Sequence, residues 1–235
     1  MITQIPRTVY VPFLRRTIAV HWQYHAALMI CVWFVLVPTA VLAVRYFKPR
    51  PTEYGIARDT GRLDRKLIWW TAHYVILYAA IGLALGGAAV AAYVSGGIHS
   101  SVHAYLGMGT LLFGCLQIGS AWLRGTHGGM HGAHSDPQDP STWHGDHYDM
   151  TPRRRWFEAY HKTTGYFALA LAVGAVGTGL MLYPAPVAAA LFAVLLLGWL
   201  VSSVLLERSG MRQDTYRSVY GNHPEHPFNR ERRDS

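Results

Sequence analysis

The sequence predicts an all-α membrane protein with five transmembrane helices, four forming an up-and-down bundle and a fifth following as a C-terminal helix. Two observations predict this class. Hydrophobic residues make up 51% of the chain and charged residues only 14%, well below the roughly 25% of soluble domains. The apolar residues are also clumped into segments that reach or approach the ~20 residues needed to cross a bilayer. These segments lie at about 20–46, 68–93, 100–123, 156–182 and 186–206.

The sequences between these segments end or reverse a helix. "SGGIHS" (95–100) leaves room only for a tight reversal, and the prolines of "YPAP" (183–186) separate the fourth helix from the fifth. The first 19 residues contain no short apolar core with a cleavage site, so we expect the first membrane helix to target the chain. The expected division is an N-terminal segment 1–19, a five-helix domain 20–206 with a histidine-rich loop 124–155, and a polar tail 207–235.

Lysine and arginine are distributed unevenly between the two sides of this bundle. The side with the amino terminus and the second-to-third and fourth-to-fifth connections holds only Arg7, Arg15 and Arg16. The positive-inside rule therefore predicts an integral inner (plasma) membrane protein with its amino terminus periplasmic and its carboxyl terminus cytoplasmic. Topology and contact with anionic lipid account for the net charge of +8. No nucleic-acid-binding module is visible, so nucleic acid is not an expected partner.

Four of the five helices carry a histidine near one end: His25, His73, His103 and His161. An ionisable residue inside a membrane helix is costly and usually marks function. Because the chain runs up and down, His25 and His103 share the outer level, and His73 and His161 share the inner level. For a single membrane histidine, a hydrogen-bonded core residue is the competing interpretation. Two pairs matched in depth favour a shared ligand instead.

Two facing imidazoles at one level of a helix bundle suit a six-coordinate haem iron, whose porphyrin leaves two axial positions to the protein. The chain has no C-x-x-C-H motif, so we predict two non-covalent haem b groups (iron protoporphyrin IX). With each ligand one or two turns inside a bilayer core ~30 Å thick, the two irons would be about 20 Å apart. Glycines after the ligands either make room for the haem or allow close helix packing. They are Gly107, Gly109 and Gly114, then Gly165, and Gly82, Gly86 and Gly87.

Basic residues at the inner end, and two further histidines at the outer end, are candidate contacts for haem propionates or a substrate. At the inner end they are Arg45, Lys66, Arg153, Arg154, Arg155 and Lys162. His21 and His99 each precede a proposed ligand by four residues, which predicts an i,i+4 pair on one helix face. We expect His21 and His99 to hydrogen-bond propionate or water. Alternatively, these two histidines accept a proton from a quinol, or they switch with His25 and His103 as the residues that bind iron.

The loop "GTHGGMHGAHSDPQDPSTWHGDHYDMTP" (125–152) combines histidine and aspartate with glycine and proline, which predicts irregular structure. Its composition suits a divalent metal such as zinc, copper or iron. The candidate ligands are His127, His131, His134, His144 and His147. The alternatives are a disordered polar linker and a loop that docks a partner. The tail "GNHPEHPFNRERRDS" (221–235) is expected to be disordered, or to order only on a partner.

Several stretches resemble the cytochrome b561 family over about residues 20–182. They are "HAALMICVWFVLVPTAVLAVRYFK" (25–48), "WWTAHYVIL" (69–77), "SVHAYLG" (101–107) and "YHKTTGYFALALAVGAVGTGL" (160–180). The resemblance implies two b haems held by one histidine on each of four helices, with first-to-third and second-to-fourth pairing. It also implies transmembrane electron transfer, with Arg45 and Lys48 near the cytoplasmic donor site. Animal and plant members have six helices and this chain five, so quinol or a partner dehydrogenase is the expected donor.

Three functions are consistent with this pattern. The first is an electron conduit between quinol or a redox protein partner and an acceptor across or within the membrane. The second is a haem-bearing anchor subunit of a larger respiratory complex. The third is a metal-handling membrane protein, or a ferric or cupric reductase, that uses the histidine-rich loop.

Overall fold

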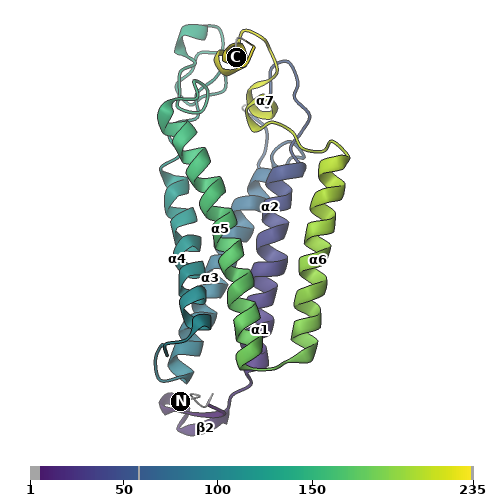
Figure 1. Cartoon of the computed structure of the whole chain (residues 1–235). Helices are drawn as coiled ribbons and strands as arrows, with labels where there is room; N and C mark the ends of the chain where they lie inside the picture. The colour runs from purple at the N-terminus through teal and green to yellow at the C-terminus, as the bar shows by residue number, and fades with distance from the viewer. Residues whose placement is uncertain (1–5, 58, 234–235) are drawn as a thin grey trace.

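The computed structural model describes residues 6–57 and 59–233, and five of its helices are long and apolar enough to cross a membrane. Figure 1 shows these helices side by side, as expected of an all-α membrane protein. The first crossing comprises α1 (Trp22–Cys31), a π-helical segment (Val32–Leu36) and α2 (Val37–Tyr46). The other four are α3 (Ile68–Val94), α4 (Val102–Trp122), α5 (Pro152–Leu182) and α6 (Pro186–Arg208).

The π-helical segment in the first crossing precedes a proline. The N–H of Val37 donates to the carbonyl of Val32, five residues earlier. Pro38 follows at once, and a proline in a helix can neither donate a backbone hydrogen bond nor fit easily against the carbonyl four residues before it. The wider π turn adds one residue to the helix at the point where the normal pattern is interrupted.

The buried core lies where the first crossing packs against α3 and α5. Its centre is apolar and includes Ile30, Val32, Phe34, Ala80 and Ala172. The small residues on α3 and α5 let the helices approach closely, as is usual in membrane bundles. Helix α6 contributes no fully buried residue. It contacts α1, the π-helical segment and α2, and stands at the edge of the bundle (Figure 1).

A β-hairpin, which the sequence analysis did not anticipate, lies at the end of the bundle where α1 begins (Figure 1). We call this end the outer end and the opposite one the inner end, after the orientation that the sequence predicts. Strands β1 (Thr8–Val11) and β2 (Arg16–Ala19) pair antiparallel around a short 3₁₀ turn (Pro12–Leu14). The indole N–H of Trp22, at the start of α1, donates to the carbonyl of Pro6 at 2.8 Å and fixes the segment to the helix.

At the inner end, the polar tail is folded, so the expectation of a disordered tail is wrong. Two short helices, α7 (Thr215–Tyr220) and α8 (Pro227–Glu231), pack against the histidine-rich loop. Tyr216 and Tyr148 are only 3% and 7% exposed and stack with ring centroids 6.4 Å apart. Long-range aromatic burial therefore orders both segments. We call residues 124–151 and 212–233 together the inner cap.

Three helix starts differ from expectation, and a capping side chain sets the start at two of them, α5 and α4. Helix α5 begins at Pro152 rather than near 156, since the Thr151 side chain accepts a hydrogen bond from the N–H of Arg154. Helix α4 begins at Val102, where Ser101 is the N-cap. Helix α1 begins at Trp22.

Candidate functional site

The four membrane histidines form two facing pairs. The ring centroids of His25 and His103 are 6.3 Å apart, and the rings are almost perpendicular at 83°. The rings of His73 and His161 are 6.4 Å apart, with an angle of 66° between their planes. No hydrogen bond joins the two rings of either pair in the part of the chain that the structure describes. Their proximity is thus not explained by direct bonding between them.

The ring spacing matches two imidazoles on opposite sides of one metal ion. A metal–nitrogen bond of about 2.0 Å on each side, plus about 1.1 Å from each nitrogen to its ring centre, gives about 6.2 Å. The observed spacings of 6.3 and 6.4 Å are close to this value. Each pair therefore has the separation that a six-coordinate haem iron requires of its axial ligands.

Each of these rings is hydrogen-bonded to a neighbouring helix. Nδ1 of His103 lies 2.8 Å from the carbonyl oxygen of Ala175, and Nδ1 of His73 lies 3.0 Å from that of Ala40. Carbonyl oxygens only accept, so both Nδ1 atoms carry the proton and Nε2 is left with a free lone pair. This is the tautomer in which histidine binds a metal through Nε2 while a carbonyl fixes the ring. The ring of His25 likewise donates to the carbonyl of Gly87.

The fourth histidine has side-chain partners instead of a carbonyl. Nδ1 of His161 lies 2.9 Å from the side-chain amide of Gln117 and 3.3 Å from the hydroxyl of Ser120. In the orientation that satisfies both ends of the Gln117 amide, its NH₂ group donates to Nδ1 of His161 and its oxygen accepts from the hydroxyl of Thr164. Sequence reasoning missed Gln117, although a glutamine in a membrane helix is itself a signal of a polar contact.

The two pairs lie at opposite ends of the bundle, and the helices give their separation. On α3, His73 belongs to the inner pair and Gly87, fourteen residues later, accepts from His25 of the outer pair. On α5, His161 and Ala175 are also fourteen residues apart and serve the inner and outer pairs in the same way. Fourteen residues at 1.5 Å each make about 21 Å along the helix axis.

The remaining two helices follow the same rule. On α4, His103 of the outer pair and Gln117 beside the inner pair are fourteen residues apart. In the first crossing, His25 and Ala40 are fifteen apart, and the interval contains the π-helical segment with its one extra residue. The π turn thus lets both residues face the bundle interior. Each of the four helices contributes one imidazole to one pair and one hydrogen-bond partner to the other pair.

Glycines make room beside the outer pair. A Cβ at Gly179 would lie 3.0 Å from Cε1 and Nδ1 of His103, so only glycine fits there without moving the ring. Gly107, one turn after His103, has no atom within 4 Å of its Cβ position. Gly87 and Gly114 instead allow close packing, against Leu28 and Ile81 respectively. Close helix packing therefore accounts for Gly87 and Gly114, whereas room for haem at the other helix glycines stays a prediction.

Two arginines lie over aromatic rings that flank the inner pair. The guanidinium of Arg124 is 5.0 Å from the ring centre of Trp70, which stacks on His73 at 6.0 Å. The guanidinium of Arg154 is 5.1 Å from the ring centre of Phe157, which lies 5.2 Å from His161. Arg154 is only 9% exposed and pairs with Glu158 on its own helix. Arg124 was not among the expected contacts.

The other basic residues expected near the inner pair make contacts elsewhere. Arg45 turns toward α6, where it pairs with Glu207 at 3.1 Å. Lys48 donates to the hydroxyl of Thr215 at 2.8 Å, and burial lowers its pKa to about 8. Arg153 donates to the carbonyl of Leu123, and Lys66 is exposed.

Two more of these residues form ion pairs. Arg155 pairs with Glu231 of α8, and Lys162 pairs with Glu158 at 2.9 Å. Both ion pairs lie at the surface of the inner end. The Arg155 pair links the tail to the start of α5.

His21 and His99 lie outside the helices, so the expected i,i+4 pairs on one helix face are wrong. His21 is the extended N-cap residue of α1, with its ring against Tyr24. His99 is in the α3–α4 connection, and its Nε2 lies 2.7 Å from the carbonyl oxygen of Ser95. Helix α1 begins only at Trp22 and α4 only at Val102, so both histidines precede their helices.

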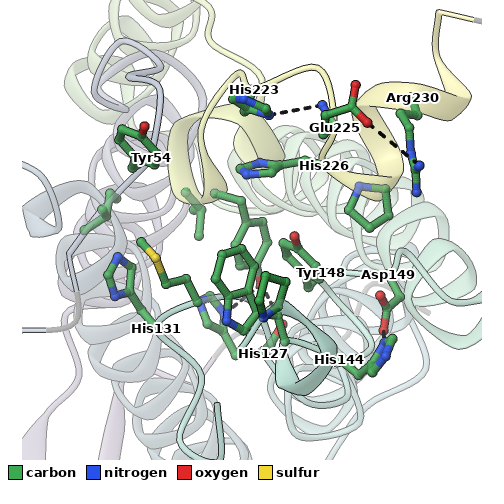
Figure 2. Close-up of a pocket in the computed structure, with 17 residues that line it drawn as sticks. Tyr54, His127, His131, His144, Tyr148, Asp149, His223, Glu225, His226 and Arg230 are labelled. Atoms are coloured by element: carbon green, nitrogen blue, oxygen red, sulfur yellow. Dashed lines mark hydrogen bonds and ion pairs between the residues drawn. The ribbon is translucent and has the colours of Figure 1, made fainter. Parts of the chain in front are cut away.

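The inner cap contains a cavity of about 420 Å³ lined by histidines and tyrosines from the loop and the tail (Figure 2). Within residues 6–57 and 59–233, no three histidine, cysteine, aspartate or glutamate side chains are arranged to hold a metal ion. His131 lines the cavity, His134 is exposed, and His144 pairs with Asp149 at 3.3 Å.

The other two histidines of the loop join its aromatic cluster. Nδ1 of His127 lies 3.2 Å from the hydroxyl of Tyr220, and His147 lies against the same tyrosine with ring centroids 5.0 Å apart. His147 is 7% exposed, and burial together with the nearby Arg154 lowers its pKa to about 2. His147 is therefore neutral at physiological pH.

The comparisons with known proteins returned no relative. No protein-family model matches the chain, and neither the curated proteins nor the solved structures contain a match.

Proposed function

We propose that this protein is a transmembrane electron carrier that binds two haem b groups, one between His25 and His103 and one between His73 and His161. The observation that carries the proposal is the spacing of 6.3 and 6.4 Å between rings whose other nitrogens are held by neighbouring helices. The resemblance to the cytochrome b561 family supports the same pairing.

The chain's own residues would perform three tasks in this function. The four histidines hold the iron, which supplies the one-electron chemistry. The carbonyls of Ala40 and Ala175 keep the proton on Nδ1 and prevent ring rotation. The positive charges of Arg124 and Arg154, beside the aromatic neighbours of the inner pair, would stabilise the reduced state. Arg124 is available to a haem propionate, whereas Arg154 shares Glu158 with Lys162.

The separation of the two pairs suits electron transfer through the membrane. About 21 Å along the bundle separates the levels of the two pairs, and the large haem ring makes the edge-to-edge distance shorter. The pairs lie near opposite ends of five helices that can cross a membrane. An electron entering at one surface would then leave near the other.

We further propose that the amino terminus faces the periplasm and that the inner cap faces the cytoplasm. The concentration of lysine and arginine at the inner end supports this orientation in an inner (plasma) membrane. We propose quinol or a redox protein as the molecule that exchanges electrons with the haems. The haems themselves would carry out the electron transfer, so the chain needs no further catalytic group.

Pigment analysis of the protein purified from membranes tests the proposal. We expect two haem b groups per chain by pyridine haemochrome assay, and a reduced-minus-oxidised spectrum with the sharp alpha band of bis-histidine haem. Electron paramagnetic resonance of the oxidised protein should show low-spin ferric iron in two environments. A protein that stays colourless when expressed with added haem precursor, or that binds zinc or copper instead, would refute it.

A further inference from the structure

A second cavity, of about 340 Å³, lies between α2, α5 and α6 near the inner end of the bundle. Its volume is within the roughly 300–1,000 Å³ of small-molecule sites. It is lined by Val41, Leu42, Arg45, Tyr46, Tyr166, Trp199 and Ser203. The lining combines apolar side chains with several groups able to hydrogen-bond, although all three helices are membrane-crossing elements.

The polar groups of this cavity form one network across three helices. Arg45 donates to the hydroxyl of Tyr166 at 2.8 Å and to the carboxylate of Glu207 at 3.1 Å. The hydroxyl of Tyr46 also donates to Glu207, at 2.9 Å. Arg45 is thus neutralised by Glu207, and Glu207 also accepts from Arg212 beyond the end of α6. A cavity cation that is already paired favours a neutral polar ligand over an anionic headgroup.

One donor in the cavity wall has no partner. Nε1 of Trp199 is shielded from solvent and makes no hydrogen bond within the described part of the chain. Leaving a buried N–H unpaired is unfavourable, because the water it would bind in the unfolded chain is lost. Nε1 is covered by neighbouring atoms, so a ligand carbonyl in this cavity would satisfy it only by displacing them. Trp199 lies on α6, the crossing without a proposed haem ligand, so the haem function leaves this residue unexplained.

The cavity also lies beside the inner histidine pair. Val41 directly follows Ala40, whose carbonyl oxygen lies 3.0 Å from Nδ1 of His73. Tyr166 is five residues after His161 on α5, about 7.5 Å along the helix. Tyr166 is 48% exposed, so the cavity opens between the helices toward the surrounding lipid. A ligand entering from the bilayer would stop close to the inner pair.

We propose that this cavity binds the head group of a quinone or quinol, with Trp199 and Tyr166 as its hydrogen-bonding contacts. A quinone is neutral, partitions into lipid and carries two carbonyl acceptors for such donors. This inference rests on the proposed haem function. Oxidation of one quinol would break its two O–H bonds and release two electrons and two protons. The electrons would reduce two ferric haems, one each, and the protons would pass to water at the inner surface.

Photolabelling tests the binding site without relying on haem. The protein in lipid nanodiscs is irradiated with an azidoquinone, and the labelled peptides are identified by mass spectrometry. We expect labels on 41–46, 166 or 199–203 that excess decylubiquinone prevents. Labels elsewhere, no label, or labels that phospholipid but not decylubiquinone displaces would overturn the proposal.

Reduction kinetics provide the second arm. Trp199→Phe and Tyr166→Phe should each slow haem reduction by decylubiquinol about tenfold, the effect of one lost hydrogen bond, while dithionite still reduces both haems fully. Trp122→Phe is the matched control, because its indole N–H donates to Tyr78 on another face of the bundle. Equal rates in all three variants would refute the site. Absence of haem with intact photolabelling would refute the proposed function alone.

Discussion

The outer and inner histidine pairs have nearly the same ring spacing but very different surroundings. The rings of His25 and His103 are fixed by backbone carbonyls, beside glycines, and no described lysine or arginine makes an ion pair or ring contact there. The inner pair has Arg124 and Arg154 over its aromatic neighbours, and the cap lies above it. The ring spacing is thus repeated at both ends, whereas the charge around it is not. Two equal ligand sets in unequal fields would give two different haem potentials.

Removing one ligand from each pair gives the largest expected effect. His103→Ala should abolish the outer haem and His161→Ala the inner haem, because one axial ligand is then missing and the pocket is left open. Haem content should fall from two per chain to one in each variant. A potentiometric titration should lose the lower-potential component in the first variant and the higher-potential component in the second.

The control for these variants is His99→Ala, since His99 is exposed and outside α4. It should keep both haems. Loss of the same component in both ligand variants would contradict the assignment of the pairs to two separate sites.

A smaller effect is expected from the charge that distinguishes the pairs. Arg154→Gln removes a nearly buried cation beside Phe157 and His161, so the reduced inner haem loses stabilisation. The inner midpoint potential should fall by roughly 60 mV, about tenfold in the one-electron equilibrium, while the outer potential stays constant. Arg153→Gln is the matched control, because Arg153 is exposed and bonds the carbonyl of Leu123. Equal shifts at both haems would mean that a global change, not local charge, is responsible.

The pairing could be predicted from the sequence because it depends only on helix count and position. In an up-and-down bundle the depth of a residue follows from its distance to the helix end, and His25, His73, His103 and His161 are all near an end. Helix rotation is not determined in this way. The sequence analysis therefore placed Arg45 at the correct level but did not anticipate its pairing with Glu207 on α6.

Three other features depend on contacts that the sequence pattern does not reveal. The π-helical segment before Pro38 changes the helix phase by one residue, which a regular periodicity cannot show. Gln117 resembles any polar residue of a membrane helix until α5 is placed beside it. The inner cap folds because Tyr216 and Tyr220 bury against Tyr148, some seventy residues earlier in the chain. A tail rich in charge and proline gave no local signal of that packing.

A further prediction tests the space around the outer pair. Gly179→Ala would place a Cβ 3.0 Å from the ring of His103, forcing the imidazole to move. The outer haem should then dissociate about tenfold faster in a transfer assay to apomyoglobin, as expected from overpacking by about 1–3 kcal/mol. The inner haem should be unaffected. Gly177→Ala, on the same helix with nothing within 4 Å of its Cβ position, is the matched control. Equal rates of outer-haem loss in both variants would show that the position of the His103 ring does not depend on the space at Gly179.

The last effect concerns the cap, which covers only the inner end. Burial and Arg154 lower the pKa of His147 to about 2, from 6.5 when it is exposed. Between these values the opened cap binds a proton that the closed cap excludes, so closed-cap stability falls as pH decreases below 6.5 and is constant above it. The loss is about 1.4 kcal/mol per pH unit. His127 and Arg124 also face His147 and act in the same direction.

Hydrogen exchange of residues 215–231, corrected for the intrinsic pH dependence, measures this effect. Protection should be lower at pH 5 than at pH 7.5, while exchange in α3 and in the outer hairpin stays unchanged. His147→Leu removes one titrating group together with the unpaired Nε2, so about half of the pH dependence should vanish. The rest belongs to His127, whose pKa burial lowers to about 4. His134→Gln, an exposed histidine of the same loop, should retain the full dependence. A pH dependence that is undiminished in the His147 variant would assign the opening to the other buried histidines of the cap, such as His127, and the asymmetry between the two ends would then not depend on His147.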